Sequence, residues 1–356
     1  MRLAIATNPA RCGVEPAIYQ SSHAVPNRAG PVTGKRLAAA AGRVQRAGMG
    51  PEARSRTSAG IVIYHPDDAG RPLERLVAAV AAGLREVVIF ANSDVTPQIE
   101  RLLSDAAAPT PLRLVRADGN VGLGAAYNAL LEEAERAGDR FLLLLDQDSL
   151  PPEGAVEELA DLHGRLLAAG ERPAIVGPQP LDPQGSPMKL ALAARPAPHA
   201  LEGEASRVAF VISSGSLVDV EAARSVGPFR ADFFIDGIDL EWCFRATARG
   251  LSIFVANRVR MHHRLGRGVI RVPLVGLLLA DQPPRRLYTF LRNQLEMLRL
   301  PHVPFGHKAK TVLSLPVRLP VYLIRNRFSR DVRAAIRNGL RDGVASRLGP
   351  PDDALR

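Results

Sequence analysis

Two aspartates follow an apolar run near the middle of the chain. Asp146 and Asp148 come directly after four leucines, and only Gln147 separates them. Because side chains alternate with a period of two along an extended strand, both carboxylates are expected on the same side of the strand end. There they can hold a hard divalent cation through oxygen ligands and leave positions open for a diphosphate. The other interpretation is an ordinary turn, because Asp and Ser commonly end strands.

A second segment, residues 118–128, places glycines at the start of an expected helix. Its sequence, DGNVGLGAAYN, puts Asp118 and Asn120 just before Gly122 and Gly124. Free backbone N–H groups at a helix N-terminus can bind an anionic ligand. The same glycines also fit a tight junction between a strand and a helix, and the residue types alone leave both interpretations open.

Three acidic residues, Asp236, Asp239 and Glu241, stand at the start of an expected amphipathic helix. Carboxylates in a first helical turn complement the helix dipole. One of them can instead serve as a general base that takes a proton from a hydroxyl. Trp242 in the same segment is expected either to stack on a sugar or to be buried in a helix interface. His263, further along the chain, is either a metal ligand or a structural histidine.

The segments that must position these residues alternate between strand and helix patterns. Such alternation predicts a mostly parallel α/β sheet, in which ligands lie outside the carboxyl ends of the strands. Short apolar runs predict strands at 60–64, 86–90, 112–115, 140–145 and 174–178 and a further sheet segment at 206–220, and amphipathic stretches predict helices at 72–84, 96–106, 122–137 and 240–249.

The composition excludes several protein classes. With 46% hydrophobic and 23% charged residues among 356, the chain can bury a sizeable core, and two cysteines rule out a disulfide scaffold. No apolar run reaches the roughly 18 residues that a spanning helix needs, and the N-terminus lacks the apolar stretch of a signal peptide. We therefore expect a cytoplasmic protein.

The net charge of +10 is unevenly distributed along the chain. Residues 1–58 carry nine basic and two acidic side chains, residues 260–356 carry nineteen and six, and the residues between them carry eighteen and twenty-eight. An acidic centre between basic ends does not resemble a nucleic-acid-binding protein, so no such partner is expected. It fits an acidic metal site combined with a basic surface for phosphate or anionic lipid.

Five motifs follow one another along the chain: VIYHPD at 62–67, NVGLGAAYN at 120–128, LLDQDS at 144–149, SSGSLV at 213–218, and FFIDGIDLEWCFRA at 233–246 followed by HRLG. Their order and spacing resemble those of the inverting family 2 glycosyltransferases, most closely the rhamnosyltransferase branch. A weaker similarity continues at Arg286 and Asn293 and at residues 338–343. The resemblance implies a GT-A fold with a mostly parallel central sheet and flanking helices.

By this resemblance, a nucleoside diphosphate sugar donor lies across the carboxyl edge of the sheet. The second strand of the family normally ends in an Asp-Asn pair, and Ala91 replaces the Asp here, so one expected contact to the nucleotide is missing. The residues implied to bind the donor are Tyr64, His65, Asn92, Asp118, Asn120 and Asp146.

The resemblance also implies a divalent metal, Mg²⁺ or Mn²⁺, held by Asp148, His263 and Asp146. Asp239 aligns with the family's catalytic base, which deprotonates an acceptor hydroxyl as its oxygen attacks the anomeric carbon from the face opposite the diphosphate. Asp236 is the competing candidate for that base. The residues implied to contact the acceptor are Asp236, Glu241 and Trp242.

The implied function is transfer of rhamnose from dTDP-rhamnose to a hydroxyl of a polysaccharide or lipid-linked acceptor in the cell envelope. Transfer of another sugar, such as that of UDP-galactofuranose, is one alternative, and a nucleotide-sugar-binding protein without transferase activity is another. A dinucleotide-binding dehydrogenase is excluded, because no G-x-G-x-x-G follows the first strand.

Three regions are expected. Residues 1–58 lack any sustained periodicity and are predicted to be a disordered basic arm, with a transit peptide as the alternative. Residues 59–265 form the GT-A catalytic domain, and residues 266–356 form a basic helical region. Six arginines lie among apolar residues at 312–337. This segment fits either contact with the inner face of the plasma membrane or packing on the catalytic domain, and its two prolines are expected to prevent one long regular helix.

Overall fold

The computed structural model describes residues 56–66, 71–182, 184–263, 268–272 and 277–351. All of them belong to one compact unit, Arg46–Arg356. The predicted disordered arm lies outside the described residues except for its last three, of which Thr57 and Ser58 already belong to the first strand.

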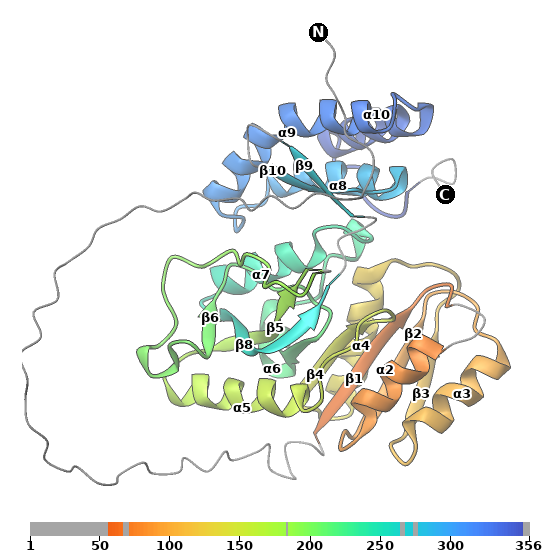
Figure 1. The fold of residues 1–356 in the computed structure, drawn as a ribbon, viewed down its shortest axis with the longest axis vertical. Coiled ribbons are helices and arrows are strands. Elements are labelled where there is room, and N and C mark those ends of the chain that lie inside the picture. The colour runs from red at the N-terminus through yellow and green to blue at the C-terminus, as the bar shows by residue number, and fades with distance from the viewer. Residues whose placement is uncertain (1–55, 67–70, 183, 264–267, 273–276, 352–356) are drawn as a thin grey trace, which may run out of the picture. The chain divides into compact units, whose positions relative to one another are not determined.

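An eight-stranded sheet forms the centre of this unit, with the strand order β3-β2-β1-β4-β7-β5-β8-β6 (Figure 1). Strands β1 to β4 are parallel to their neighbours among themselves, as are β5 and β8, whereas β7 is antiparallel to β4 and β5, and β6 is antiparallel to β8. The strands are β1 Thr57–Ile63, β2 Glu86–Ala91, β3 Leu112–Arg116, β4 Phe141–Asp146, β5 Pro173–Leu181, β6 Ala205–Arg207, β7 Ser216–Asp219 and β8 Ser252–His262. The prediction of a mostly parallel α/β sheet is confirmed.

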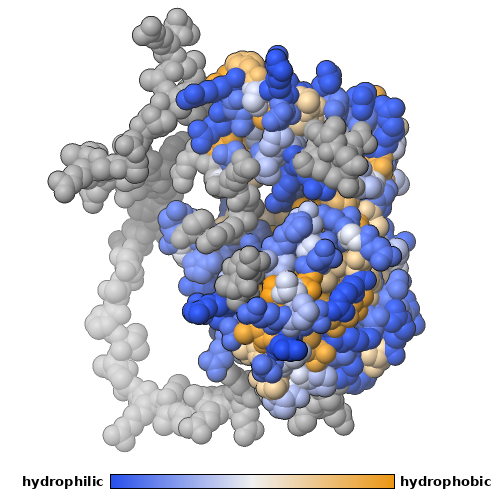
Figure 2. Space-filling view, turned by 90° about the vertical axis from the view of Figure 1, so that its right-hand side faces the viewer, coloured by the Kyte–Doolittle hydropathy of each residue, from blue (hydrophilic) through white to orange (hydrophobic). Residues whose placement is uncertain are grey.

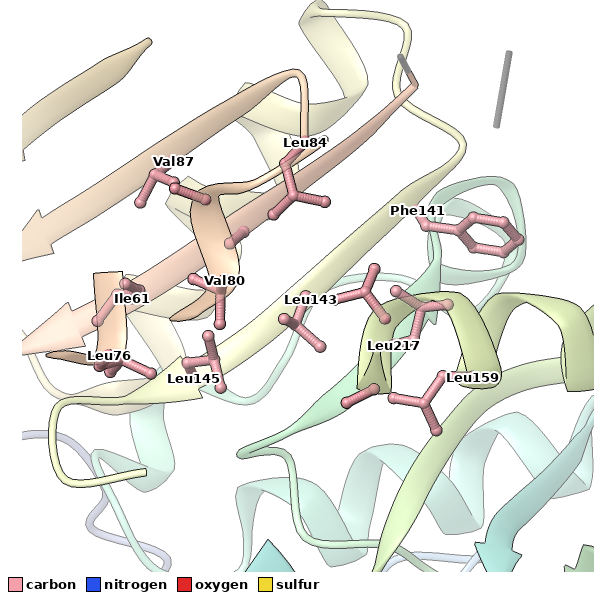
Figure 3. Close-up of a cluster of buried hydrophobic side chains, with 14 of the residues drawn as sticks. Ile61, Leu76, Val80, Leu84, Val87, Phe141, Leu143, Leu145, Leu159 and Leu217 are labelled. Carbon is pink, nitrogen blue, oxygen red and sulfur yellow. The ribbon is translucent and has the colours of Figure 1, made fainter. Parts of the chain in front are cut away.

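Alternating side chains divide the core into a layer on each face of the sheet. In β4, Leu143 and Leu145 pack on one face and Leu142 and Leu144 on the other, as a period of two requires. The first layer, part of which Figure 3 shows, is covered by α2, α3 and α5, and the second is covered by α4, α6 and α7. These helices are α2 Arg71–Ala81, α3 Pro97–Ala107, α4 Leu123–Arg136, α5 Ala155–Ala168, α6 Val220–Val226 and α7 Ile238–Ala248.

The chain then forms a short antiparallel pair, β9 Val269–Val272 and β10 Leu277–Ala280, and three helices, α8 Pro284–Met297, α9 Phe305–Arg325 and α10 Arg330–Val344. Helices α8 and α10 pack closely because α10 presents glycines to α8. A Cβ atom on Gly339 would lie 2.8 Å from the Tyr288 carbonyl oxygen, and one on Gly343 would lie 2.9 Å from that of Arg292. The face drawn in Figure 2 is mainly hydrophilic, with smaller hydrophobic patches between the polar side chains.

Helix α9 continues through Pro316 and Pro320, so the expectation that these prolines prevent one long helix is wrong. Each proline removes the hydrogen bond to the carbonyl group four residues earlier. The carbonyls concerned belong to Val312 and Pro316, which are both exposed, and water can therefore satisfy them. The free-energy cost of each lost hydrogen bond is thereby reduced, and the helix continues through both prolines.

Candidate active site

Strand β4 ends at Asp146, and hydrogen bonds to neighbouring strand ends fix the loop that follows. The Asp146 amide donates to Ser214 Oγ at 2.8 Å, just before β7. The Tyr64 amide donates to Gln147 Oε1 at 2.8 Å, and Gln147 Nε2 donates to the Tyr64 carbonyl at 3.1 Å. These bonds join the ends of β1 and β4 to the start of β7. They hold the two aspartates at the carboxyl edge of β4.

The Asp146 carboxylate lies in a crowded electrostatic environment. The Tyr127 hydroxyl donates to Asp146 Oδ1 at 3.2 Å. Burial, together with the nearby charge of Asp148, raises the pKa of Asp146 to about 6. The imidazole of His263 interacts electrostatically with Asp148, while burial and the charge of Arg286 lower its pKa. The structure therefore brings Asp146, Asp148 and His263 into one cluster.

The two candidate bases have different surroundings. Asp236 Oδ1 accepts a hydrogen bond from Arg286 Nη2 at 2.8 Å, and Asp236 Oδ2 accepts one from Thr289 Oγ1 at 2.6 Å. Asp239 Oδ1 accepts from the Leu240 amide at 2.9 Å, and within the described part of the chain Asp239 forms no ion pair. Burial, reinforced by neighbouring carboxylates, raises the pKa of Asp239 to about 6. Asp236 is therefore paired with a cationic side chain, whereas the Asp239 carboxylate forms no ion pair among the described residues.

Residues 232–239, which we call the acid loop, are held in place by the glycine-rich segment. Phe234 has a φ of +69°, which is rare for a residue with a side chain. Its carbonyl accepts from the Leu123 amide at 2.6 Å, in the first turn of α4. Gly122 approaches so closely that a Cβ atom there would lie 2.6 Å from the same carbonyl oxygen. The Leu123 amide at the helix start therefore binds the acid loop, which supports packing over ligand binding as the role of these glycines.

Helix α8 holds the acid loop from the other side. Asn293 Nδ2 donates to the carbonyl of Phe233 at 2.8 Å and to that of Asp236 at 2.7 Å. Arg292 Nη2 donates to the Phe233 carbonyl at 3.0 Å, and Arg292 Nη1 donates to the carbonyl of Gly349 at 2.6 Å. Both side chains are buried. We call the four α8 residues that bond to the loop, namely Arg286, Thr289, Arg292 and Asn293, the α8 clamp.

Three of the predicted donor-binding residues are open to a ligand. Tyr64 and His65 are exposed at the end of β1, and their ring centroids lie 4.2 Å apart. The His65 amide donates to Ser93 Oγ at 2.7 Å, which ties the end of β1 to the loop after β2. Asp118 is exposed after β3. All three stand at the carboxyl ends of the parallel strands β1 and β3, which lie on either side of β2, and a ligand of such a sheet is expected at this edge.

Two other predicted donor-binding residues brace the glycine-rich segment. Asn92 is 4% exposed, and its Oδ1 accepts from the Val121 amide at 2.8 Å. Asn120 Oδ1 accepts from the Gly122 amide at 3.0 Å. Both side-chain oxygens are therefore engaged with the backbone, and these residues shape the site rather than present those oxygens to a ligand.

The structure corrects the prediction that Glu241 and Trp242 bind an acceptor. Glu241 is 1% exposed, accepts from Arg245 Nε at 2.9 Å and lies 2.8 Å from His302 Nε2. Trp242 is fully buried, stacks on Phe229 with ring centroids 5.1 Å apart, and donates to a backbone carbonyl at 3.1 Å. Both side chains are occupied inside the protein, so neither is available to an acceptor.

Asp146, Asp148 and His263 offer ligand atoms that a hard divalent cation binds, namely carboxylate oxygens and one imidazole nitrogen. The pKa of Asp146, raised to about 6 by burial and by Asp148, would fall if a cation stabilised the ionised form. Among the residues that the structure describes, no three His, Cys, Asp or Glu side chains form a group that holds a metal by itself. A cation would therefore take further ligands from a diphosphate or water, as Mg²⁺ commonly does.

Several residues around this cluster were not among the predicted site residues. Tyr127, Gln147 and Ser214 lie inside motifs that the sequence displays, so the signal for them was present. Arg286 and Thr289 lie in the basic helical region that was expected after the catalytic domain. Only the similarity at residues 286–293 pointed toward them.

Comparisons with known proteins indicate a glycosyltransferase domain and fold. Residues 61–227 match the model of glycosyl transferase family 2. Over 193 residues the chain is 28% identical to the dTDP-rhamnosyl transferase RfbF of Shigella flexneri, a match that covers 52% of this chain and 62% of that protein. The fold resembles that of TarS from S. aureus, with a TM-score of 0.50, 17% identity, and coverage of 84% of this chain and 50% of that one. A complex of TarS residues 1–349 with UDP gives a TM-score of 0.51 at 16% identity, over 82% of this chain and 81% of that one.

Proposed function

We propose that the protein is an inverting glycosyltransferase that moves rhamnose from dTDP-rhamnose to an acceptor hydroxyl. The match of residues 61–227 to the family 2 glycosyltransferase model and the GT-A fold of the described chain support the proposal. The observation that carries the proposal is the Asp239 carboxylate, which forms no ion pair among the described residues and interacts electrostatically with Asp146 at the end of β4.

Asp239 is proposed as the base of the reaction. Its pKa of about 6 leaves the carboxylate mostly ionised at pH 7.5 while keeping it basic enough to accept a proton. The acceptor hydroxyl transfers its proton to Asp239 as its oxygen bonds to the anomeric carbon. The bond from that carbon to the diphosphate oxygen breaks, and its electron pair leaves with the nucleoside diphosphate. Attack from the face opposite the leaving group inverts the anomeric centre.

Asp148 and His263, with Asp146 beside them, are the residues proposed to hold a divalent cation. When bound, such a cation supplies positive charge to the diphosphate and to the charge that develops on the leaving group. Tyr64, His65 and Asp118 are the exposed residues placed to border the nucleotide. Asp236 is proposed to remain paired with its α8 partners rather than to take the proton.

The rhamnose donor is supported by the printed name of the Shigella flexneri relative, of which the match covers 62%. The decisive test offers purified protein dTDP-rhamnose, UDP-galactofuranose and UDP-hexoses in turn, with lipid and polysaccharide extracts as acceptors. Mass spectrometry and linkage analysis then identify the product. Transfer from a UDP-sugar but not from dTDP-rhamnose would overturn the rhamnose assignment. Binding of nucleotide sugars without transfer to any acceptor would favour an inactive binding protein.

Contact with an anionic membrane is proposed for α9, since a lipid-linked acceptor would be found there. Phe305, Val312, Leu313 and Ile324 are 84%, 53%, 75% and 47% exposed. Their spacing places them on one face of the helix, and exposed basic residues such as Lys310 lie next to that face. Apolar side chains flanked by basic ones are typical of helices that lie in a membrane interface. None of the described helices is long and apolar enough to cross a membrane.

Liposome flotation tests this contact. We expect binding to vesicles that contain anionic phosphatidylglycerol, weakened by high salt because the attraction is partly electrostatic. Leu313→Gln should reduce binding, whereas Leu192→Gln, which replaces a leucine that is 69% exposed elsewhere, should not. Absence of binding at low salt would remove the membrane proposal and leave the transfer reaction untouched.

A further inference from the structure

The first turn of α8 places one cation among the carboxylates of the candidate site. Arg286 Nη2 donates to Asp236 Oδ1 at 2.8 Å. The guanidinium also interacts electrostatically with Asp146 and Asp239, and it acts on His263, whose pKa it lowers. Arg286 is therefore close to the end of β4, the acid loop and the end of β8 at the same time.

The pair with Asp236 does not use all the hydrogen-bonding capacity of Arg286. A guanidinium carries five N–H donors. Among the residues that the structure describes, the Nε atom is buried without a hydrogen-bond partner, although the side chain as a whole is 41% exposed. Thr289 Oγ1 satisfies the second oxygen of Asp236 at 2.6 Å, so the carboxylate serves as a fixed anchor. The anchor orients the guanidinium and leaves its other donors for a further partner.

The charge of the surroundings indicates the class of that partner. Four carboxylates, those of Asp146, Asp148, Asp236 and Asp239, interact electrostatically with one another or with Arg286 in the site proposed for the donor. A diphosphate adds further negative charge and is bound well only where cations face it. Arginine suits this role because its planar N–H groups match the geometry of phosphate oxygens.

We infer that Arg286 is a donor-binding residue that hydrogen-bonds the diphosphate of the nucleotide sugar and of the leaving nucleoside diphosphate. The inference rests on the proposed glycosyltransferase function. It makes the helical region after the sheet a part of the donor site, although the family match ends at residue 227. Asp236 then acts as a positioning residue that holds Arg286 toward the diphosphate.

The test measures ligand binding by isothermal titration calorimetry with MgCl₂ present. The probes are dTDP and UDP, with thymidine and uridine as ligands that lack phosphate. We expect Arg286→Gln to weaken binding of the preferred nucleoside diphosphate on the order of 10- to 100-fold, as loss of a charged hydrogen bond does. Binding of the matching nucleoside should not change. Arg333→Gln removes the same charge from an exposed position on α10 and should leave both affinities unchanged.

Two further variants distinguish direct contact of Arg286 with the diphosphate from the positioning of Arg286 by Asp236. Arg286→Lys keeps the charge without the planar fork and should recover part of the lost affinity. Asp236→Asn removes the charge that orients Arg286 but leaves the guanidinium in place, so it should weaken nucleoside diphosphate binding less than Arg286→Gln does. If Arg286→Gln bound the nucleoside diphosphate as the wild type does, or if Asp236→Asn lost as much affinity as Arg286→Gln, the inference would be overturned. If the wild type bound neither dTDP nor UDP, the proposed function itself would fail.

Discussion

Replacing Asp239 by Asn should abolish most of the turnover and, at the same time, stabilise the fold. The pKa of Asp239 is raised from 3.8 to about 6, chiefly by burial. A raised pKa means that the folded state favours the protonated carboxyl, so ionisation opposes folding. This cost is absent below pH 3.8 and complete above about pH 6. The size of the shift corresponds to a free energy of unfolding lowered by up to about 3 kcal/mol at pH 7.5.

Asparagine has nearly the same shape as aspartate and no charge. Asp239→Asn should therefore recover up to about 3 kcal/mol of stability at pH 7.5 in the metal-free protein. Turnover should fall by about two to four orders of magnitude, because the group that accepts the acceptor's proton is gone. Binding of the nucleotide should change little, since Asp239 is proposed to act on the acceptor.

Asp236→Asn is the matched control, because the two aspartates stand three residues apart in the acid loop. It removes a charge that Arg286 and Thr289 already satisfy, so it should lower the free energy of unfolding by about 2 kcal/mol. Urea unfolding in EDTA at pH 7.5, and single-turnover transfer with radiolabelled donor, measure the two effects. If Asp239→Asn kept near wild-type turnover while Asp236→Asn lost it, the assignment of the base would be wrong. A lower stability of Asp239→Asn at pH 7.5 would refute the electrostatic reasoning.

Three further predictions concern the metal, the pH dependence and the glycine-rich segment. Asp148→Ala and His263→Ala should each weaken the Mg²⁺-dependent part of dTDP binding, measured by titration with and without EDTA; an unchanged Mg²⁺ dependence in both would remove them as ligands. The value of kcat/KM should fall about tenfold per pH unit below pH 6, because Asp239, with a pKa of about 6, must be ionised to accept a proton; a flat profile down to pH 5 would contradict this role. Gly122→Ala should cost about 2 kcal/mol or more and lower turnover, because its Cβ would lie 2.6 Å from the Phe234 carbonyl oxygen at a φ of +86°. Gly138→Ala, with a φ of +70° and open space, should cost only about 1 kcal/mol and leave turnover intact.

The first half of the sheet could be predicted because its signals are local. Each strand from β1 to β4 is a short apolar run, and each helix between them shows amphipathic spacing. Helix α5 has no counterpart among the predicted helices. The helical spacing of Val156, Leu159, Leu162 and Leu166 is nevertheless visible in the sequence, and all four side chains are buried.

The contacts of the candidate site depend on parts of the chain far apart in sequence, and local patterns carry little information about them. Asp236 and Arg286 are separated by 50 residues, and no periodicity relates a turn to a helix at that distance. Burial of Glu241 and Trp242 depends on which face of α7 packs inward. The sequence does not indicate that face, because the first turn of the helix has polar and apolar residues on several sides. The order of the motifs predicted that Asp146, Asp148 and His263 lie close together. The packing of the helices determined which of the predicted site side chains remain accessible.

The position of the α8 clamp in the chain has a consequence for biosynthesis. When the ribosome has synthesised the chain as far as His262, every strand of the central sheet has been made, together with Asp146 at the end of β4 and Asp148 after it. The residues that fix the acid loop from behind start at Arg286, and the Gly349 carbonyl that holds Arg292 comes still later. A nascent chain of that length therefore contains all strands of the sheet but not the residues that order the acid loop. Transfer activity should appear only after synthesis has passed Gly349, so shorter nascent chains would not consume donor.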